Sequence, residues 1–278
     1  MELVIRGGEI EIAAPIEFDP DKTFGCGQCF RWERDESGGY VGVAEGLGCR
    51  VRRDGPGVFV ACGPGDFERV WRRYFDLDRD YAAIRESLYV DEFTRKAAMH
   101  GAGIRILRQN AWEALCSFIV SQCNNIPRIK RIIDALCREF GDPVSFEGHE
   151  LYAFPPAARL APLSERDLAG LRCGYRAEYI IAAAGAVASG CPDLEALARG
   201  SLPDACAELK KLRGVGDKVA LCAALFGLGM MDAFPVDVWM KRALALHYGK
   251  EFDPGVFSPH AGIAQQYIYY YMREAADV

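Results

Sequence analysis

The chain lacks the long apolar stretch that a membrane-spanning helix needs. Its longest hydrophobic segments are interrupted by Arg, Glu or Gly, whereas a span requires about 20 consecutive apolar residues. The first residues, MELVIR, show neither a secretory pattern nor a basic, acid-poor transit pattern. No internal repeat or low-complexity tract is present. We therefore expect a cytoplasmic, nucleoid-associated protein if the source is prokaryotic, or a nuclear one if it is eukaryotic.

Cysteine is present, but not in a pattern that binds zinc or builds a disulfide framework. The 11 cysteines are scattered and odd in number, which favours reduced, buried thiols. Cys26 and Cys29 form one C-x-x-C, but there is no second C-x-x-C, and neither His100 nor His149 lies at zinc-finger spacing. The sequence therefore predicts no zinc site.

The chain also lacks an excess of positive charge. Its 278 residues carry a net charge of −6, which argues weakly against a nucleic-acid partner. The net charge is a poor guide for a protein that would bind nucleic acid with only one face. Basic residues gather locally at Lys210, Lys211, Arg213 and Lys218.

Two kinds of segment follow each other along the chain. Short alternating runs near residues 30–34, 40–43, 49–52 and 57–60 predict antiparallel strands. Apolar residues then follow a helical period. We predict an α+β protein with an N-terminal antiparallel sheet domain and flanking helices over residues 1–90. A mostly α-helical domain should follow over residues 91–278, with helices at 92–100, 111–123, 126–140, 165–171, 178–189, 194–199, 203–211, 217–226, 238–248 and 259–272.

The stretch that organises the chain is a predicted helix-hairpin-helix over residues 203–227, with the turn LRGVG. Gly214 and Gly216 can adopt positive φ and allow close approach of another backbone. The N–H groups that begin the second helix favour an anion, naturally a phosphate. Lys218 lies in the first turn of that helix. Asp237, in PVDVW, is placed to cap a third helix.

The segments LRGVGDKVA and PVDVW resemble the helix-hairpin-helix, Gly/Pro-rich, Asp superfamily of DNA glycosylases, and the hairpin lysine resembles that of the bifunctional members. Further segments resemble its 8-oxoguanine DNA glycosylase branch. These are GQCFRW from Gly27, SQCNNIPRI from Ser121, GYR from Gly174 and AGIAQQYIY from Ala261. The resemblance covers nearly the whole chain, least clearly residues 1–20 and 33–90.

The resemblance implies an enzyme that removes 8-oxoguanine from duplex DNA and then cuts the strand, in base excision repair. Lys218 would attack the sugar C1′ and form an imine, and Asp237 would stabilise positive charge on the sugar. The Gly27 carbonyl would bind the N7–H that distinguishes 8-oxoguanine from guanine. Gln265 would read the flipped base between Tyr269 and Cys222.

Other matching residues are implied to bind DNA: Asn124, Asn125, Arg128, Tyr175, Arg176, Gly214 and Gly216. Arg128 and Arg176 would contact the cytosine left unpaired, and Tyr175 would wedge the duplex. Two residues depart from the family pattern. Cys123 replaces the first asparagine of a triplet, which bears on opposite-base preference, and Trp239 replaces a phosphate-binding histidine.

The resemblance implies no cofactor and no catalytic metal. A monovalent cation could be held by the carbonyls of Lys210, Leu212 and Val215. Some relatives carry a four-cysteine iron–sulfur cluster near the C-terminus, but no cysteine follows Cys222 here. The implied partner is double-stranded DNA with oxidised guanine, opposite cytosine, bound by a monomer that does not associate with membranes.

Two other functions are open at this stage. A monofunctional alkylpurine glycosylase would need no lysine at the hairpin. A non-catalytic duplex-binding module would use the hairpin as a phosphate clamp. Single residues also have structural alternatives. Lys218 could contact a phosphate, Asp237 could only cap, Gly27 could be a turn glycine, and Cys222 and Tyr269 could be core residues. In the segments SQCNNIPRI and GYR, an asparagine such as Asn125 could be a helix N-cap, an arginine a surface residue and the tyrosine a packed residue.

Overall fold

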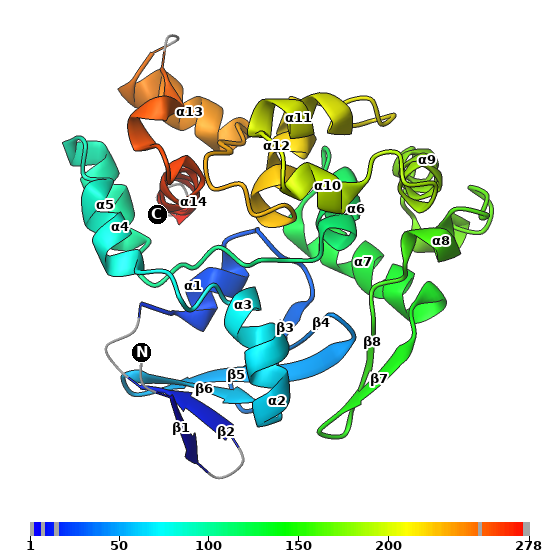
Figure 1. The fold of residues 1–278 in the computed structure, drawn as a ribbon, viewed down its shortest axis with the longest axis horizontal. Helices are drawn as coiled ribbons and strands as arrows, with labels where there is room; N and C mark the ends of the chain where they lie inside the picture. The colour runs from blue at the N-terminus through cyan, green and yellow to red at the C-terminus, as the bar shows by residue number, and fades with distance from the viewer. Residues whose placement is uncertain (1–2, 7–8, 14–16, 250–251, 275–278) are drawn as a thin grey trace. The chain divides into compact units, whose positions relative to one another are not determined.

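The computed structural model describes residues 3–6, 9–13, 17–249 and 252–274, and the chain forms two compact units (Figure 1). Unit 1 comprises Met1–Gln28, Val51–Arg108 and Met230–Val278, and unit 2 comprises Cys29–Arg50 and Gln109–Gly229. The expected domain boundary between residues 90 and 91 stays a prediction. Among the described residues, no helix is both long and apolar enough to cross a membrane.

The N-terminal antiparallel sheet predicted from the alternating runs is confirmed. Six strands form one sheet in the order β1-β2-β6-β5-β4-β3, and the pairs β1/β2, β2/β6 and β3/β4 are antiparallel. Ile10 and Ile12 lie opposite Val60 and Val58, and all four are buried, because alternate side chains point to one face. The strands are β1 (Leu3–Arg6), β2 (Glu9–Ile12), β3 (Trp32–Arg34), β4 (Tyr40–Ala44), β5 (Leu47–Asp54) and β6 (Gly57–Ala61).

Helices complete unit 1. Phe67, Trp71, Tyr74 and Phe75 recur at helical spacing and are all buried. The C-terminal helix α14 packs against α5 and α13 (Figure 1). The helical segments of unit 1 are α1 (Pro20–Gly25), α2 (Pro64–Asp66), a π-helical turn (Phe67–Trp71), α3 (Arg72–Tyr74), α4 (Tyr81–Ser87), α5 (Glu92–His100), α13 (Val238–His247), a 3-10 turn (Pro254–Phe257) and α14 (Ala261–Glu274).

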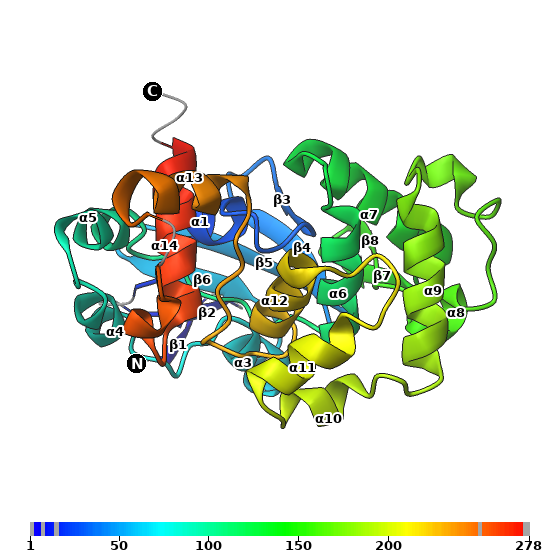
Figure 2. The same cartoon turned by 90° about the horizontal axis from the view of Figure 1, so that it is seen from above.

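The core of unit 2 is built around α6 (Ala111–Val120), which is apolar nearly all round and buried along almost its whole length. It packs against α12 and α9. Figure 2 shows α11 and α12 as consecutive helices joined by a short turn, as the hairpin pattern predicts. The other helices are α7 (Ile126–Phe140), α8 (Ala157–Leu160), a 3-10 turn (Ala169–Leu171), α9 (Arg176–Ala188), α10 (Leu194–Ala198), α11 (Leu202–Leu209) and α12 (Asp217–Phe226).

Residues 143–152, for which the sequence predicted no helix, form an antiparallel hairpin of β7 (Pro143–Phe146) and β8 (His149–Tyr152), because Glu147 and Gly148 both adopt positive φ and form a tight turn. One predicted helix is wrong: residues 165–171 are mostly turns. There the Asp167 carboxylate accepts hydrogen bonds from the backbone and side chain of Ser164, and the only helical segment of this described stretch is the 3-10 turn Ala169–Leu171.

Candidate active site

The hairpin turn between α11 and α12 has the conformation that its glycines predict. Gly214 has φ +80°, and a Cβ built on it would lie 2.3 Å from the Tyr179 ring, so only glycine fits there. Arg213 forms an ion pair with Glu178, which lies next to Tyr179 on α9. Gly216 is the N-cap of α12, and a Cβ added to it would meet no atom within 4 Å. The first turn of α12 therefore begins next to an exposed glycine, Gly216.

Lys218 lies in that first turn and is half-buried. Its Nζ donates a hydrogen bond to Ser121 Oγ at 3.0 Å and lies 5.0 Å from the centre of the Phe118 ring. Phe118 stacks on Phe226 from the other end of α12, with ring centres 5.3 Å apart. The amine is thus held at the edge of an aromatic cluster. Cys222, one turn later on α12, is buried.

Asp237 is the N-cap of α13, as predicted. Its backbone is extended, with φ −98° and ψ −166°, and its Oδ1 accepts a hydrogen bond from the Met240 N–H at 2.9 Å. The preceding Pro235 is buried, and a proline disfavours helical conformation in the residue before it. Capping fixes the orientation of the carboxylate, so the structural and the chemical role of Asp237 can coexist.

Helix α14 carries two of the four residues implied to bind the base. Gln265 is buried, and among the described residues its Oε1 has no hydrogen-bond partner. Tyr269 follows one turn later, with the Arg273 guanidinium 5.7 Å from its ring centre. Burial raises the pKa of the Tyr269 hydroxyl, an effect that Arg273 opposes and the Asp237 carboxylate supports. An unsatisfied buried amide is a group that a ligand can pair with.

Gly27 sits in a loop that buried side chains hold on both sides. It has φ +78°, a conformation that favours glycine. Gln28 is fully buried and bonds the backbone of Thr23, Arg105 and Leu107. Gln266 donates to the Cys26 carbonyl at 2.7 Å. Sequence reasoning assigned no role to Gln28 or Gln266; the only signal was that each is an amide residue inside a family motif, next to a residue that was assigned a role.

The residues implied to contact DNA from unit 2 form one cluster. Asn125 is the N-cap of α7 and accepts a bond from the Arg128 N–H, while the Asn124 side chain donates to the Val120 carbonyl. Arg128 donates to the Arg172 carbonyl at 3.2 Å. The capping alternative for Asn125 is therefore realised, and its contact with DNA stays a prediction.

Tyr175 and Arg176 lie beside the same loop but differ in exposure. Tyr175 is 50% exposed, whereas Arg176 is 3% exposed. The Arg176 guanidinium donates to the carbonyls of Gln122 and Cys123. It thus holds the loop backbone. The Tyr175 hydroxyl also donates to the Gln122 carbonyl, at 3.4 Å. Contacts of Tyr175 and Arg176 with DNA stay predictions.

The two residues that depart from the family pattern are both accessible. Cys123 is exposed and has φ +46°, a left-handed conformation that asparagine adopts more readily than most residues. Trp239 is half-buried, with the Arg242 guanidinium 5.8 Å from its ring centre. The left-handed backbone gives a physical reason for an asparagine at position 123.

The carbonyls suggested for a monovalent cation lie in the hairpin turn. The Leu212 carbonyl accepts a hydrogen bond from the Val215 N–H at 3.1 Å, which leaves one lone pair for a ligand. A monovalent cation at the carbonyls of Lys210, Leu212 and Val215 stays a prediction.

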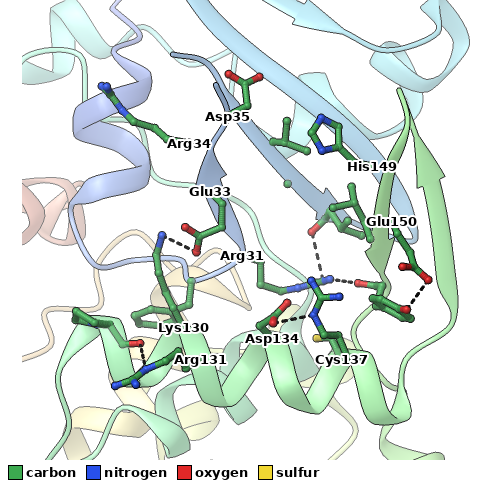
Figure 3. A pocket seen from close by; sticks show the side chains of 18 of the residues that line it. Arg31, Glu33, Arg34, Asp35, Lys130, Arg131, Asp134, Cys137, His149 and Glu150 are labelled. Carbon is green, nitrogen blue, oxygen red and sulfur yellow. Dashed lines mark hydrogen bonds and ion pairs between the residues drawn. The ribbon is translucent and has the colours of Figure 1, made fainter. Parts of the chain in front are cut away.

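A separate groove of about 900 Å³ opens in unit 2 between β3, β4, α7 and β8 (Figure 3). Three of its cationic side chains are paired with carboxylates: Lys130 with Glu33, Arg138 with Asp134, and Arg31 with Glu113. None of the predicted site residues, all of which the structure describes, lines this groove. The groove is therefore distinct from the predicted site.

Comparison with known proteins gives a consistent result. Residues 11–115 match the family of the 8-oxoguanine DNA glycosylase N-terminal domain, and residues 116–255 match that of the HhH-GPD superfamily base excision DNA repair protein. The chain is 40% identical to MBOgg1, solved in complex with a low-affinity DNA ligand, with a TM-score of 0.93 and 99% of each chain covered.

Two further relatives agree. The Clostridium acetobutylicum 8-oxoguanine glycosylase/lyase, solved with double-stranded DNA containing cytosine opposite 8-oxoguanine, is 34% identical, with a TM-score of 0.92 over 99% of each chain. The Saccharomyces cerevisiae N-glycosylase/DNA lyase is 32% identical over 80% of this chain. That match spans 66% of the yeast protein, just under two thirds of its length.

Proposed function

Since the chain belongs to the HhH-GPD superfamily of base excision DNA repair proteins, we propose that it is a bifunctional DNA glycosylase and AP lyase. Its substrate is duplex DNA that contains 8-oxoguanine. The observation that carries the proposal is the position of Lys218, half-buried in the first turn of the second hairpin helix and held by Ser121. A surface lysine that only contacts phosphate has no need of this tether.

In the proposed reaction the neutral Lys218 amine attacks C1′ of the flipped nucleotide. The C1′–N9 bond breaks, and the base leaves with a proton. Opening of the sugar ring gives an imine between Nζ and C1′. The imine acidifies the C2′ proton, and loss of that proton expels the 3′ oxygen, which cuts the strand by β-elimination. Water then hydrolyses the imine and releases the enzyme.

Asp237 supplies negative charge to this reaction. Its carboxylate would stabilise the positive charge that develops on the sugar, and would help to accept the proton from the amine. The Met240 N–H holds one carboxylate oxygen. The second oxygen remains for the reacting atoms.

Base selection is assigned to three elements. The Gly27 carbonyl would accept the N7–H of 8-oxoguanine. Gln265 would bind the Watson–Crick edge, and this assignment is supported by its buried Oε1, which has no hydrogen-bond partner in the part of the chain that the structure describes. Tyr269 and Cys222 would form the two walls around the base. In guanine, N7 has a lone pair in place of this N–H, so the Gly27 carbonyl would face it without a hydrogen bond. This loss supplies a few kcal/mol of discrimination against guanine.

Opposite-strand recognition is assigned to the cluster in unit 2. Tyr175 would enter the base stack, and Arg128 and Arg176 would contact the unpaired base, with cytosine as the expected partner. Asn124, Asn125 and the hairpin glycines Gly214 and Gly216 would bind backbone. An auxiliary cation on the hairpin carbonyls would strengthen phosphate binding. We also propose that the protein acts as a monomer, in the cytoplasm or, in a eukaryote, in the nucleus.

The test is borohydride trapping on duplexes with 8-oxoguanine opposite each of the four bases. We expect a covalent complex that Lys218→Gln abolishes while DNA affinity persists. Release of free base without a trapped complex would indicate a monofunctional glycosylase. Binding with neither base release nor trapping would leave the duplex-binding module as the function.

A further inference from the structure

Helix α14 holds the backbone on the N-terminal side of Gly27. Gln266 is 3% exposed, and its Nε2 donates to the Cys26 carbonyl at 2.7 Å. Arg273, two turns later on the same face of α14, donates to the Gly25 carbonyl at 2.8 Å. Two successive carbonyls that precede Gly27 are therefore fixed by side chains of a single helix.

The backbone on the C-terminal side of Gly27 is held equally firmly. The Gln28 side chain donates to the Arg105 carbonyl at 2.7 Å and accepts from the Leu107 N–H at 2.8 Å. On the N-terminal side, burial raises the pKa of the Cys26 thiol to about 11, so the thiol stays protonated and donates to the Thr23 carbonyl. Gly27 itself has no side chain, so the direction of its carbonyl depends on how these neighbouring residues are held.

A restrained carbonyl discriminates between bases better than a mobile one. If the carbonyl could turn, it would swing away from the N7 lone pair of guanine and find another donor. The penalty for the wrong base would then disappear, whereas a fixed carbonyl retains it. Rigidity of the loop is thus what converts one hydrogen bond into selectivity.

We propose that Gln266 and Arg273 are positioning residues that set the orientation of the Gly27 carbonyl. The inference rests on the proposed excision of 8-oxoguanine. Tyr269 lies between these two residues on the same face of α14, with Arg273 beside its ring. One helix therefore carries Gln265, which reads the base, Tyr269, which stacks on it, and the two side chains that hold the Gly27 loop in place.

The experiment compares two reactions of the same protein. Excision of 8-oxoguanine needs the Gly27 carbonyl, whereas cleavage of a preformed abasic site has no base to recognise. Gln266→Met keeps the volume of the side chain and removes its donor. We expect single-turnover excision to slow about tenfold, as expected for loss of one buried hydrogen bond, while abasic-site cleavage changes by less than about twofold.

Ile268→Ala serves as the matched control, because Ile268 is buried on the same helix and has no polar group to hold the loop. This variant should lower both reactions together, through stability. Arg273→Met gives an independent measurement if Gln266→Met does not fold.

The inference is overturned if Gln266→Met slows both reactions to the same extent, or slows neither. If the wild-type protein cleaves abasic DNA but releases no 8-oxoguanine, the proposed substrate is wrong, and the positioning role falls with it. Selective loss of excision in Gln266→Met, with wild-type excision intact, supports both.

Discussion

Lys218 Nζ lies 3.0 Å from Ser121 Oγ, and the Ser121 hydroxyl in turn donates to the Phe118 carbonyl at 2.8 Å. The hydroxyl proton is therefore engaged, so the Ser121 oxygen accepts from the lysine. This bond connects the first turn of α12 with the C-terminal end of α6, across 97 residues of sequence. It restricts the directions in which the amine can point.

Replacing Ser121 with alanine should slow catalysis with little effect on folding. Without its acceptor the long Lys218 side chain samples other rotamers, and we expect the rate of borohydride trapping to fall about tenfold. Trapping under single-turnover conditions measures this rate. Ser164→Ala, a change at an exposed turn, is the control and should trap at the wild-type rate. A Ser121→Ala protein as fast as wild type would contradict a positioning role.

The two roles of Asp237 separate in two substitutions. Asp237→Asn keeps an acceptor for the Met240 N–H, so the free energy of unfolding should change by less than about 0.5 kcal/mol. The loss of charge should slow excision about 100-fold. Asp237→Ala should lose the activity and also about 1 kcal/mol of stability. Denaturant unfolding and single-turnover excision measure the two effects. Full activity in Asp237→Asn would reduce Asp237 to a cap.

Gly214 should tolerate no side chain. Alanine there combines positive φ with a clash against the Tyr179 ring, so Gly214→Ala should lower the free energy of unfolding by about 2 kcal/mol or more. Gly38→Ala is the matched control, since Gly38 has φ +83° but nothing within 4 Å of an added Cβ. It should cost only the backbone strain, about 1 kcal/mol. If both variants lose the same free energy of unfolding, the clash with Tyr179 does not contribute to the effect at Gly214.

Asparagine should be the better residue at position 123. Because Cys123 has φ +46°, we expect Cys123→Asn to raise the free energy of unfolding by about 0.5 kcal/mol. Cys123→Ser, which has no such left-handed preference, is the control.

In trapping experiments the asparagine variant should favour cytosine opposite the lesion more strongly than wild type does. A wild-type protein already fully selective for cytosine would show that Cys123 does not relax opposite-base preference.

Asp91 should make stability depend on pH in the acid range. Burial raises the pKa of this carboxyl, but hydrogen bonds from Thr94 and Tyr248 outweigh burial and lower it below its usual value. The native state therefore binds fewer protons than the unfolded state. The stabilisation is complete above the unfolded pKa of about 3.9, and it is lost as the pH falls through the lower native value.

Unfolding measured from pH 2 to pH 7 tests this dependence. Tyr248→Phe removes one of the hydrogen bonds to the Asp91 carboxylate. The difference in unfolding free energy between wild type and Tyr248→Phe should be constant near neutral pH and should shrink below about pH 4. A difference that does not depend on pH would assign the effect of Tyr248 to packing alone.

Local signals in the sequence were sufficient for the hairpin and the helix caps. Gly214 and Gly216 mark the turn because few other residues adopt its geometry, and Asp237 and Asn125 cap helices through bonds to residues three positions away. Such interactions span one turn, so the sequence displays them directly. The β7–β8 hairpin was missed because its turn residues, Glu147 and Gly148, were not recognised.

The sequence by itself thus determined the fold class, the hairpin with Lys218 in its first turn, and the cap at Asp237. Only the tertiary structure decided what holds these groups in place. Ser121 bonds Lys218 across 97 residues, and Gln266 bonds the Cys26 carbonyl across 240. Neither pairing leaves a trace in local periodicity, because each partner's identity depends on how distant segments pack. Residue types and their spacing therefore predict which chemical groups form the site, whereas packing between remote segments sets the orientation of those groups.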